Sequence, residues 1–238
     1  MKKILSYILT AICFLSLISC TSPSEDINKV ANIADEVQDY IQKAYDTKVE
    51  FVSTDRINDD YYYTYKDENG FEFTVDLNCM QCDWWPKRTY DASDNYIAGY
   101  LKAHPQNLNV FKMEGHDFRT EKHGQYVLYY DSYDDIDEAA EFALKYIDKI
   151  ELPKINYAKK PESLSYMNSK RVKLYFKPKG LDYEWTNYKS MEFPYESYPP
   201  PEELSKQIKS CHIQQLQRND DTEHLSQIPD EDIKKYGK

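Results

Sequence analysis

The sequence predicts an α+β fold in which antiparallel hairpins pack against three or four helices. Two kinds of pattern support this prediction. Apolar residues recur at helical spacing in several segments, and elsewhere apolar and polar residues alternate on either side of turns that contain glycine. The chain has 238 residues, which is enough for one large domain or two small ones.

Helices are predicted in four places. Residues 27–45 and 134–150 each carry one continuous apolar face, and acidic residues crowd the first turn of the second segment, where the helix dipole favours them. Residues 94–103 form a shorter helix that ends at a His-Pro pair, because the residue before a proline disfavours helical geometry. A last helix covers 202–217, with Pro201 well placed as its first residue.

The clearest hairpin joins residues 60–65 to residues 71–77. Asn69 and Gly70 lie between them and supply the left-handed backbone that a tight turn needs. In the second strand, apolar side chains at odd-numbered positions alternate with polar ones, which is typical of a half-buried strand. A short strand is predicted just before this hairpin, at 49–52.

Two further hairpins are predicted. One joins residues 118–120 to residues 126–130 through a turn at 122–124 that contains glycine. The other begins with an alternating strand at 172–177 and turns through a Pro-Lys-Gly sequence into 183–187.

A helix followed by a hairpin occurs at 27–77 and again at 134–187, which raises the option of two similar halves, 27–113 and 114–218. Residue identity between these segments is slight. Helix–hairpin units also recur by chance in α+β proteins, so chance recurrence is the favoured interpretation. In either case the α+β folded region is expected to cover 27–218.

The chain begins with the features of an export signal. Lys2 and Lys3 precede a mainly apolar stretch of about 15 residues, which is shorter than the roughly 20 that span a bilayer. The stretch runs into Leu17-Ile18-Ser19-Cys20, which resembles the lipobox of bacterial lipoproteins. The alternative is an ordinary cleaved signal with an incidental cysteine, but the polar residues directly after Cys20 favour the lipobox.

The resemblance implies that residues 1–19 are a signal peptide and that Cys20 becomes the lipidated N-terminus. Residues 20–26 then form the lipidated cysteine and a short polar tether. Two or three acyl chains on Cys20 would hold the protein stably on a bacterial cell membrane or outer membrane, on its extracytoplasmic side. At the other end, residues 219–238 are expected to be a polar, loosely packed tail from which Ile228 could dock.

The charge of the chain excludes one class of partner. The sequence has 30 Lys and Arg against 41 Asp and Glu, and loss of Lys2 and Lys3 with the signal leaves 28 against 41, a net charge of −13. A body this acidic repels phosphate backbones and anionic headgroups, so nucleic acid is not expected as a partner. Membrane attachment must therefore come from the lipid.

Three cysteines in the folded region are candidates for a disulfide or a metal site: Cys79, Cys82 and Cys211. Cys79 and Cys82 form a C-x-x-C pair, but Cys79 ends a predicted strand rather than opening a helix, and Asp83 follows the pair. Both features raise a thiol pKa, which argues against a redox enzyme. Zinc would need about four ligands, and Cys211 with His212 is the obvious second supplier, although neighbouring helical residues point about 100° apart. Structural or incidental cysteines are favoured, and no cofactor is predicted.

Aromatic residues suggest a binding surface. The chain has 23 tyrosines, which suit wet binding faces but also raise strand propensity. Trp84 and Trp85 could stack on a sugar or on a protein partner, or could instead plug a core. Charged residues around the second hairpin (Glu114, His116, Asp117 and His123) lack a metal-site spacing and are interpreted as solvated loop residues.

These observations favour a non-enzymatic envelope lipoprotein that binds a protein or glycan partner. The chain shows no G-x-S-x-G sequence, P-loop or dinucleotide-binding pattern. The alternative is an extracytoplasmic thiol-redox or metal-dependent enzyme that uses Cys79 and Cys82.

Overall fold

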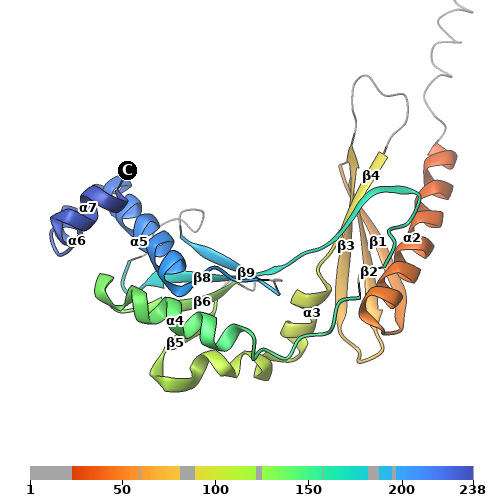
Figure 1. Cartoon of the computed structure of the whole chain (residues 1–238). Coiled ribbons are helices and arrows are strands. Elements are labelled where there is room, and N and C mark those ends of the chain that lie inside the picture. Colours follow the sequence, from red (N-terminus) through yellow and green to blue (C-terminus); the bar gives the residue numbers. More distant parts are fainter. Residues whose placement is uncertain are drawn as a thin grey trace, which may run out of the picture. The chain divides into compact units, whose positions relative to one another are not determined.

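The computed structural model describes residues 23–58, 60–80, 89–121, 125–156, 158–181, 188–194 and 197–237, with side chains from Ile33 onward. The fold is α+β, as the sequence predicts. The chain divides into two compact units (Figure 1). The first contains the described residues up to Glu68 together with Asp76–Ala92 and Ile155–Met167, and the second contains Asn69–Val75, Ser93–Lys154 and the described residues from Asn168.

The first sheet has five strands in the order β1-β2-β3-β4-β7. Its elements, with the helix that precedes them, are α2 (Pro23–Tyr45), β1 (Val49–Ile57), β2 (Asp60–Asp67), β3 (Glu72–Met80), β4 (Thr89–Asp94) and β7 (Leu164–Ser169). The predicted helix at 27–45 and the hairpin through Gly70 are both confirmed, and Gly70 has the positive φ of 89° that the turn requires. The strand predicted at 49–52 is longer than expected and contains a bulge between Phe51 and Ser53.

The core of the first unit lies between α2 and β2. Ile33, Val37 and Ile41 are buried on one helix face, as their spacing predicts. Tyr63 and Tyr65 are buried on the same side of β2, and the Tyr65 hydroxyl donates a hydrogen bond of 2.8 Å to the carbonyl oxygen of Ala34 on α2. Tyr63 and Tyr65 thus contribute to this core, where both rings are buried and the Tyr65 hydroxyl has a hydrogen-bond partner.

Two strands of this sheet were not predicted. β4 has the sequence TYDASD and β7 has LSYMNS, and neither shows a strong apolar alternation. They are neighbours in the sheet although about 70 residues separate them in the chain. Their pairing is therefore non-local, and a local pattern could not reveal it.

The second sheet has four strands in the order β5-β6-β8-β9. The elements of this unit are α3 (Tyr96–Ala103), η1 (Pro105–Gly115), β5 (Asp117–Thr120), β6 (Tyr126–Tyr130), η3 (Tyr133–Asp135), α4 (Ile136–Ile147), β8 (Val172–Pro178), β9 (Ser190–Phe193), α5 (Pro201–Arg218), α6 (Thr222–Leu225) and α7 (Asp230–Tyr236). The predicted helices at 94–103, 134–150 and 202–217 correspond to α3, to η3 with α4, and to α5. The hairpin of β5 and β6 is also confirmed.

Two details of the second sheet differ from the sequence prediction. β6 and β8 pair in parallel, because the long connection through α4 allows a crossover rather than a hairpin. β8 pairs with β9 at 190–193, whereas the predicted partner strand at 183–187 lies outside the described residues. The possible half at 114–218 is divided between the two sheets, since β7 belongs to the first sheet and β8 to the second.

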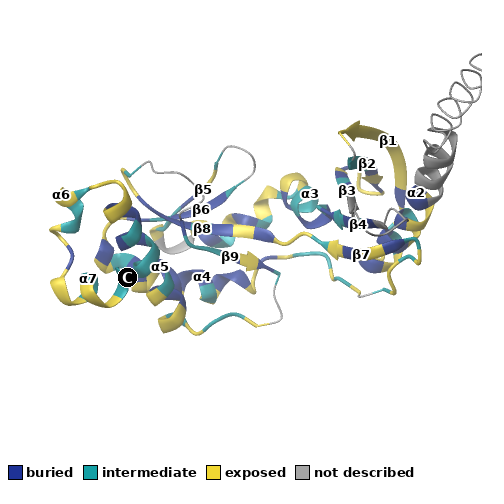
Figure 2. Cartoon of the chain, turned by 90° about the horizontal axis from the view of Figure 1, so that it is seen from above, coloured by how far each residue is buried: buried dark blue, intermediate teal, exposed yellow. Residues whose placement is uncertain are grey.

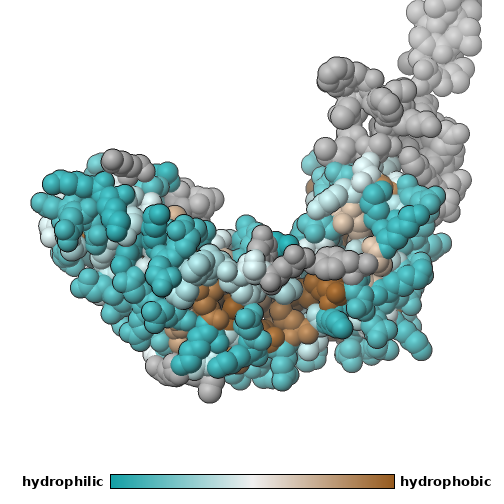
Figure 3. Space-filling view, in the orientation of Figure 1, coloured by the Kyte–Doolittle hydropathy of each residue, from teal (hydrophilic) through white to brown (hydrophobic). Residues whose placement is uncertain are grey.

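Helices α4 and α5 pack against each other and bury the inner face of the second sheet (Figure 2). This core contains Leu128, Leu174, Phe176, Phe193, Ile136, Ala140, Ala143, Leu204 and Ile208. Hydrophilic residues dominate most of the visible outer surface of both units (Figure 3). This packing places the start of α5 beside β9, the last strand of the sheet.

The segment expected to be a loose polar tail contains two short helices, α6 and α7. Ile228 lies between them and is buried, and Ser210 on α5 donates a hydrogen bond of 2.9 Å to the carbonyl oxygen of Tyr236. The tail is thus held against α5 at two points. Among the described residues, no helix is both long and apolar enough to cross a membrane.

Candidate functional site

Five of the candidate residues that the sequence singles out fall outside the described part of the chain. These are Cys20, Cys82, Trp84, Trp85 and His123. Cys79 lies in β3 and Glu114 in η1, but neither side chain is described. The proposals for lipidation, for a C-x-x-C site and for a Trp pair therefore stay predictions.

Cys211 lies on α5 and is a free, half-buried thiol. Burial raises its pKa above the ordinary value, which keeps the thiol protonated and weakens it as a nucleophile or metal ligand. Among the described residues, no group of three or more His, Cys, Asp and Glu side chains could hold a metal ion.

His212, the neighbour of Cys211, is part of the core. Its Nδ1 lies 2.9 Å from the hydroxyl of Tyr130 on β6. Burial, with a smaller contribution from His224, lowers the pKa of His212 to about 4. The imidazole is therefore neutral at physiological pH and joins α5 to the sheet. Sequence reasoning considered His212 only as a metal ligand.

Two of the charged residues expected in a solvated loop near the second hairpin, His116 and Asp117, have structural partners. His116 stacks on Phe142 with the ring centres 3.8 Å apart. Asp117 accepts two hydrogen bonds from Arg119, at 2.8 and 2.7 Å, and these hold the pKa of the Asp117 carboxyl below its usual value. His116 is thus packed rather than solvated, and the pair of Asp117 and Arg119 is an ordinary surface ion pair.

The feature with the clearest capacity to bind a ligand is the free edge of β9. Phe176 on β8 donates a hydrogen bond of 2.9 Å to the carbonyl oxygen of Lys189. Because successive residues of a strand direct their main-chain groups to opposite sides, Ser190 and Glu192 must direct theirs away from β8. Within the part of the chain that the structure describes, no main-chain hydrogen bond is made to this side of β9. Two N–H groups and two carbonyl groups therefore have no main-chain partner among the described residues.

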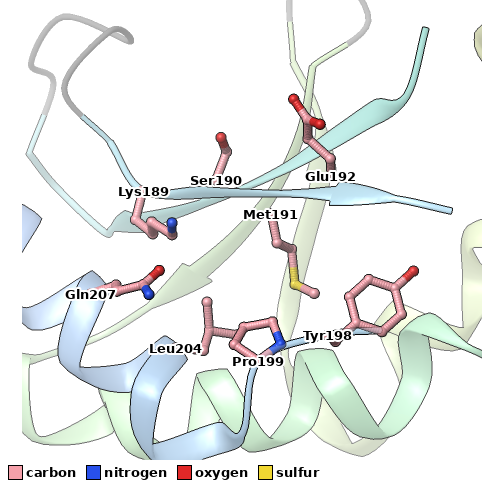
Figure 4. A pocket seen from close by; sticks show the side chains of 8 residues that line it. All are labelled: Lys189, Ser190, Met191, Glu192, Tyr198, Pro199, Leu204 and Gln207. Carbon is pink, nitrogen blue, oxygen red and sulfur yellow. The ribbon is translucent and has the colours of Figure 1, made fainter. Parts of the chain in front are cut away.

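A groove of about 370 Å³ lies between this edge of β9, the first two turns of α5 and the segment before α5. We call it the β9–α5 groove; it is lined by Lys189, Ser190, Met191, Glu192, Tyr198, Pro199, Leu204 and Gln207. Figure 4 shows the Met191 side chain pointing from β9 toward Pro199 and Leu204. Lys189 and Gln207 lie at one end of the groove, and Tyr198 lies at the other (Figure 4). The groove thus has an apolar floor and polar ends.

The charges of the β9–α5 groove are unequal. Glu192 is 3.8 Å from both Arg171 and Lys173, so its carboxylate is already compensated. Lys189 has no ion-pair partner among the described residues. The side-chain amide of Gln207 donates one hydrogen bond of 3.0 Å to Glu203 and keeps its carbonyl oxygen and a second N–H for another partner. Among the described residues, the groove therefore presents one positive charge without an ion-pair partner, at the Lys189 end.

Sequence reasoning missed this groove. β9 has four residues and follows a segment in which another strand was expected, so its position at the sheet edge could not be inferred. One local signal was available, the three consecutive prolines Pro199 to Pro201. Prolines cannot join a strand ladder, but they are favoured at the start of a helix. They therefore separate the chain before α5 from the sheet. No protein-family model matches the chain, and no match was found among curated proteins or solved structures.

Proposed function

We propose that the protein is a lipid-anchored extracytoplasmic lipoprotein that binds a protein partner in the β9–α5 groove. The observation that carries the binding proposal is the free edge of β9 beside an apolar floor. Ser190 and Glu192 repeat their outward groups every two residues, a spacing of roughly 6.8 Å that matches an extended chain. A peptide added as a further strand would satisfy these groups and place alternate side chains in the groove.

The composition supports a protein partner outside the cytoplasm. The lipobox-like sequence at Cys20 accounts for membrane attachment that an acidic body could not achieve by charge. The net charge also disfavours nucleic acid. A groove of 370 Å³ is large enough for a few side chains of a bound segment, and its ends offer polar groups that could orient that segment.

Site-specific photo-cross-linking in intact cells tests the binding proposal. A photoreactive amino acid at Gln207, inside the groove, is expected to yield a discrete adduct with a partner protein. The matched position is Glu141, an exposed residue of α4 that does not line the groove. Adducts of equal yield at both positions, or no adduct at Gln207, would contradict the proposal.

Ser190→Pro provides a second control within the same experiment. Proline removes the outward N–H of Ser190 but no hydrogen bond to β8, so the sheet is expected to form normally. Loss of a main-chain hydrogen bond and crowding of the edge should lower the yield of the Gln207 adduct about tenfold. Circular dichroism of the purified variant shows whether the fold is retained.

A further inference from the structure

We infer, on the premise of the proposed function, that the β9–α5 groove binds an extended segment antiparallel to β9, with an acidic side chain opposite Lys189 and an apolar side chain opposite Met191. In an antiparallel pair the numbering of the two strands runs in opposite directions. The apolar residue of the bound segment must therefore come two positions before the acidic one.

The alternation of side chains along β9 supports this register. Lys189, Met191 and Phe193 share one face of the strand, and Met191 and Phe193 are buried toward α5. Directly opposite residues of an antiparallel pair lie on the same face, with Cβ atoms about 5 Å apart. A partner residue opposite Met191 would thus enter the space bounded by Pro199 and Leu204, which is apolar.

Electrostatics identifies the acidic residue. Of the described charges of the groove, that of Lys189 has no ion-pair partner, whereas Glu192 already has Arg171 and Lys173 within 4 Å. A carboxylate opposite Lys189 would form an ion pair with its ammonium group and could also accept a hydrogen bond from the Gln207 amide. The formal charge of −11 disfavours a strongly acidic partner, so a single acidic residue in an otherwise neutral or basic segment fits best.

The available main-chain groups allow either direction, and antiparallel pairing is the more stable of the two. Ser190 and Glu192 each offer an N–H and a carbonyl oxygen on the same side, so a facing residue can exchange both hydrogen bonds with each of them. Parallel addition would use slanted bonds and is slightly less stable per residue.

Selection from a peptide library tests the inference. The purified full chain, in detergent, is incubated with two pools of random seven-residue peptides, one with both termini blocked and one with a free carboxyl terminus. Peptides from the blocked pool are expected to be enriched in an apolar residue two positions before Asp or Glu. Lys189→Gln is expected to weaken binding of a selected Glu peptide about tenfold and to leave binding of its Gln counterpart unchanged.

Each other outcome has one interpretation. Some enriched peptides could bind in the groove, as shown by weaker binding to Ser190→Pro, and yet lack this spacing or carry the acidic residue before the apolar one. Such peptides would overturn the register but leave the proposal of peptide binding intact. Enrichment only in the pool with free carboxyl termini would show capture of a terminal carboxylate and would also overturn it. If neither pool yields peptides that bind the wild-type chain more tightly than they bind the Ser190→Pro variant, the proposed function itself fails.

Discussion

Lowering the pH from 6.5 to 4 is expected to remove about 3 kcal/mol from the free energy of unfolding through His212 alone. Burial lowers the pKa of His212 to about 4 in the folded chain, against 6.5 for an exposed histidine. Above pH 6.5 the imidazole is neutral in both states. Between pH 6.5 and 4 the unfolded chain binds a proton that the folded chain does not, so stability falls as the pH falls through this window.

Urea unfolding at pH 7 and at pH 4.5 measures this effect. His212→Gln should be less stable than the wild type at pH 7, because the contact with the Tyr130 hydroxyl is lost, but should lose much less further stability on acidification. His104→Gln is the matched control, since His104 is only partly buried and contacts Tyr100. A pH dependence that is the same in His212→Gln as in the wild type would contradict the assignment.

Cys20→Ala is expected to abolish lipid anchoring, leaving the chain either released or retained as an uncleaved precursor. No acyl chain can be added without the thiol, and the negative net charge of the chain disfavours adhesion to anionic lipids. Fractionation of cells, followed by a carbonate wash and immunoblotting, separates the two forms by location and size.

Cys211→Ala is the matched control for Cys20→Ala. Cys211 is a half-buried residue of α5 and plays no part in the proposed anchor, so its variant should fractionate with membranes like the wild type. A Cys20→Ala protein that is processed normally and still resists the carbonate wash would contradict lipidation.

Helices α2, α3, α4 and α5 could be predicted because their information is local. Val37 and Ile41 lie on the apolar stripe of α2, and the stripe of α4 and the proline that opens α5 are equally clear. The hairpin through Gly70 could be predicted for the same reason, since Asn69 and Gly70 specify the turn without help from distant residues.

The candidate site could not be predicted because its geometry is non-local. Lys189 and Met191 lie outside the elements predicted from the sequence, and their position depends on the pairing of β8 with β6 on one side and with β9 on the other. Only this strand order makes β9 an edge, and only the packing of α5 brings Leu204 and Gln207 beside it. His212 was considered for a metal because it follows Cys211. Its burial beside Tyr130 could not be predicted, since Tyr130 lies 82 residues away in the chain.

Hydrogen exchange of the β9 amides tests strand addition most directly. In the free protein the amides of Ser190 and Glu192 should exchange rapidly, while that of Met191, which points toward β8, should be protected. On binding the partner captured at Gln207, or a selected peptide, Ser190 and Glu192 should become protected at least tenfold and Met191 should change little. Binding that leaves both Ser190 and Glu192 unprotected would contradict the groove as a strand-binding site.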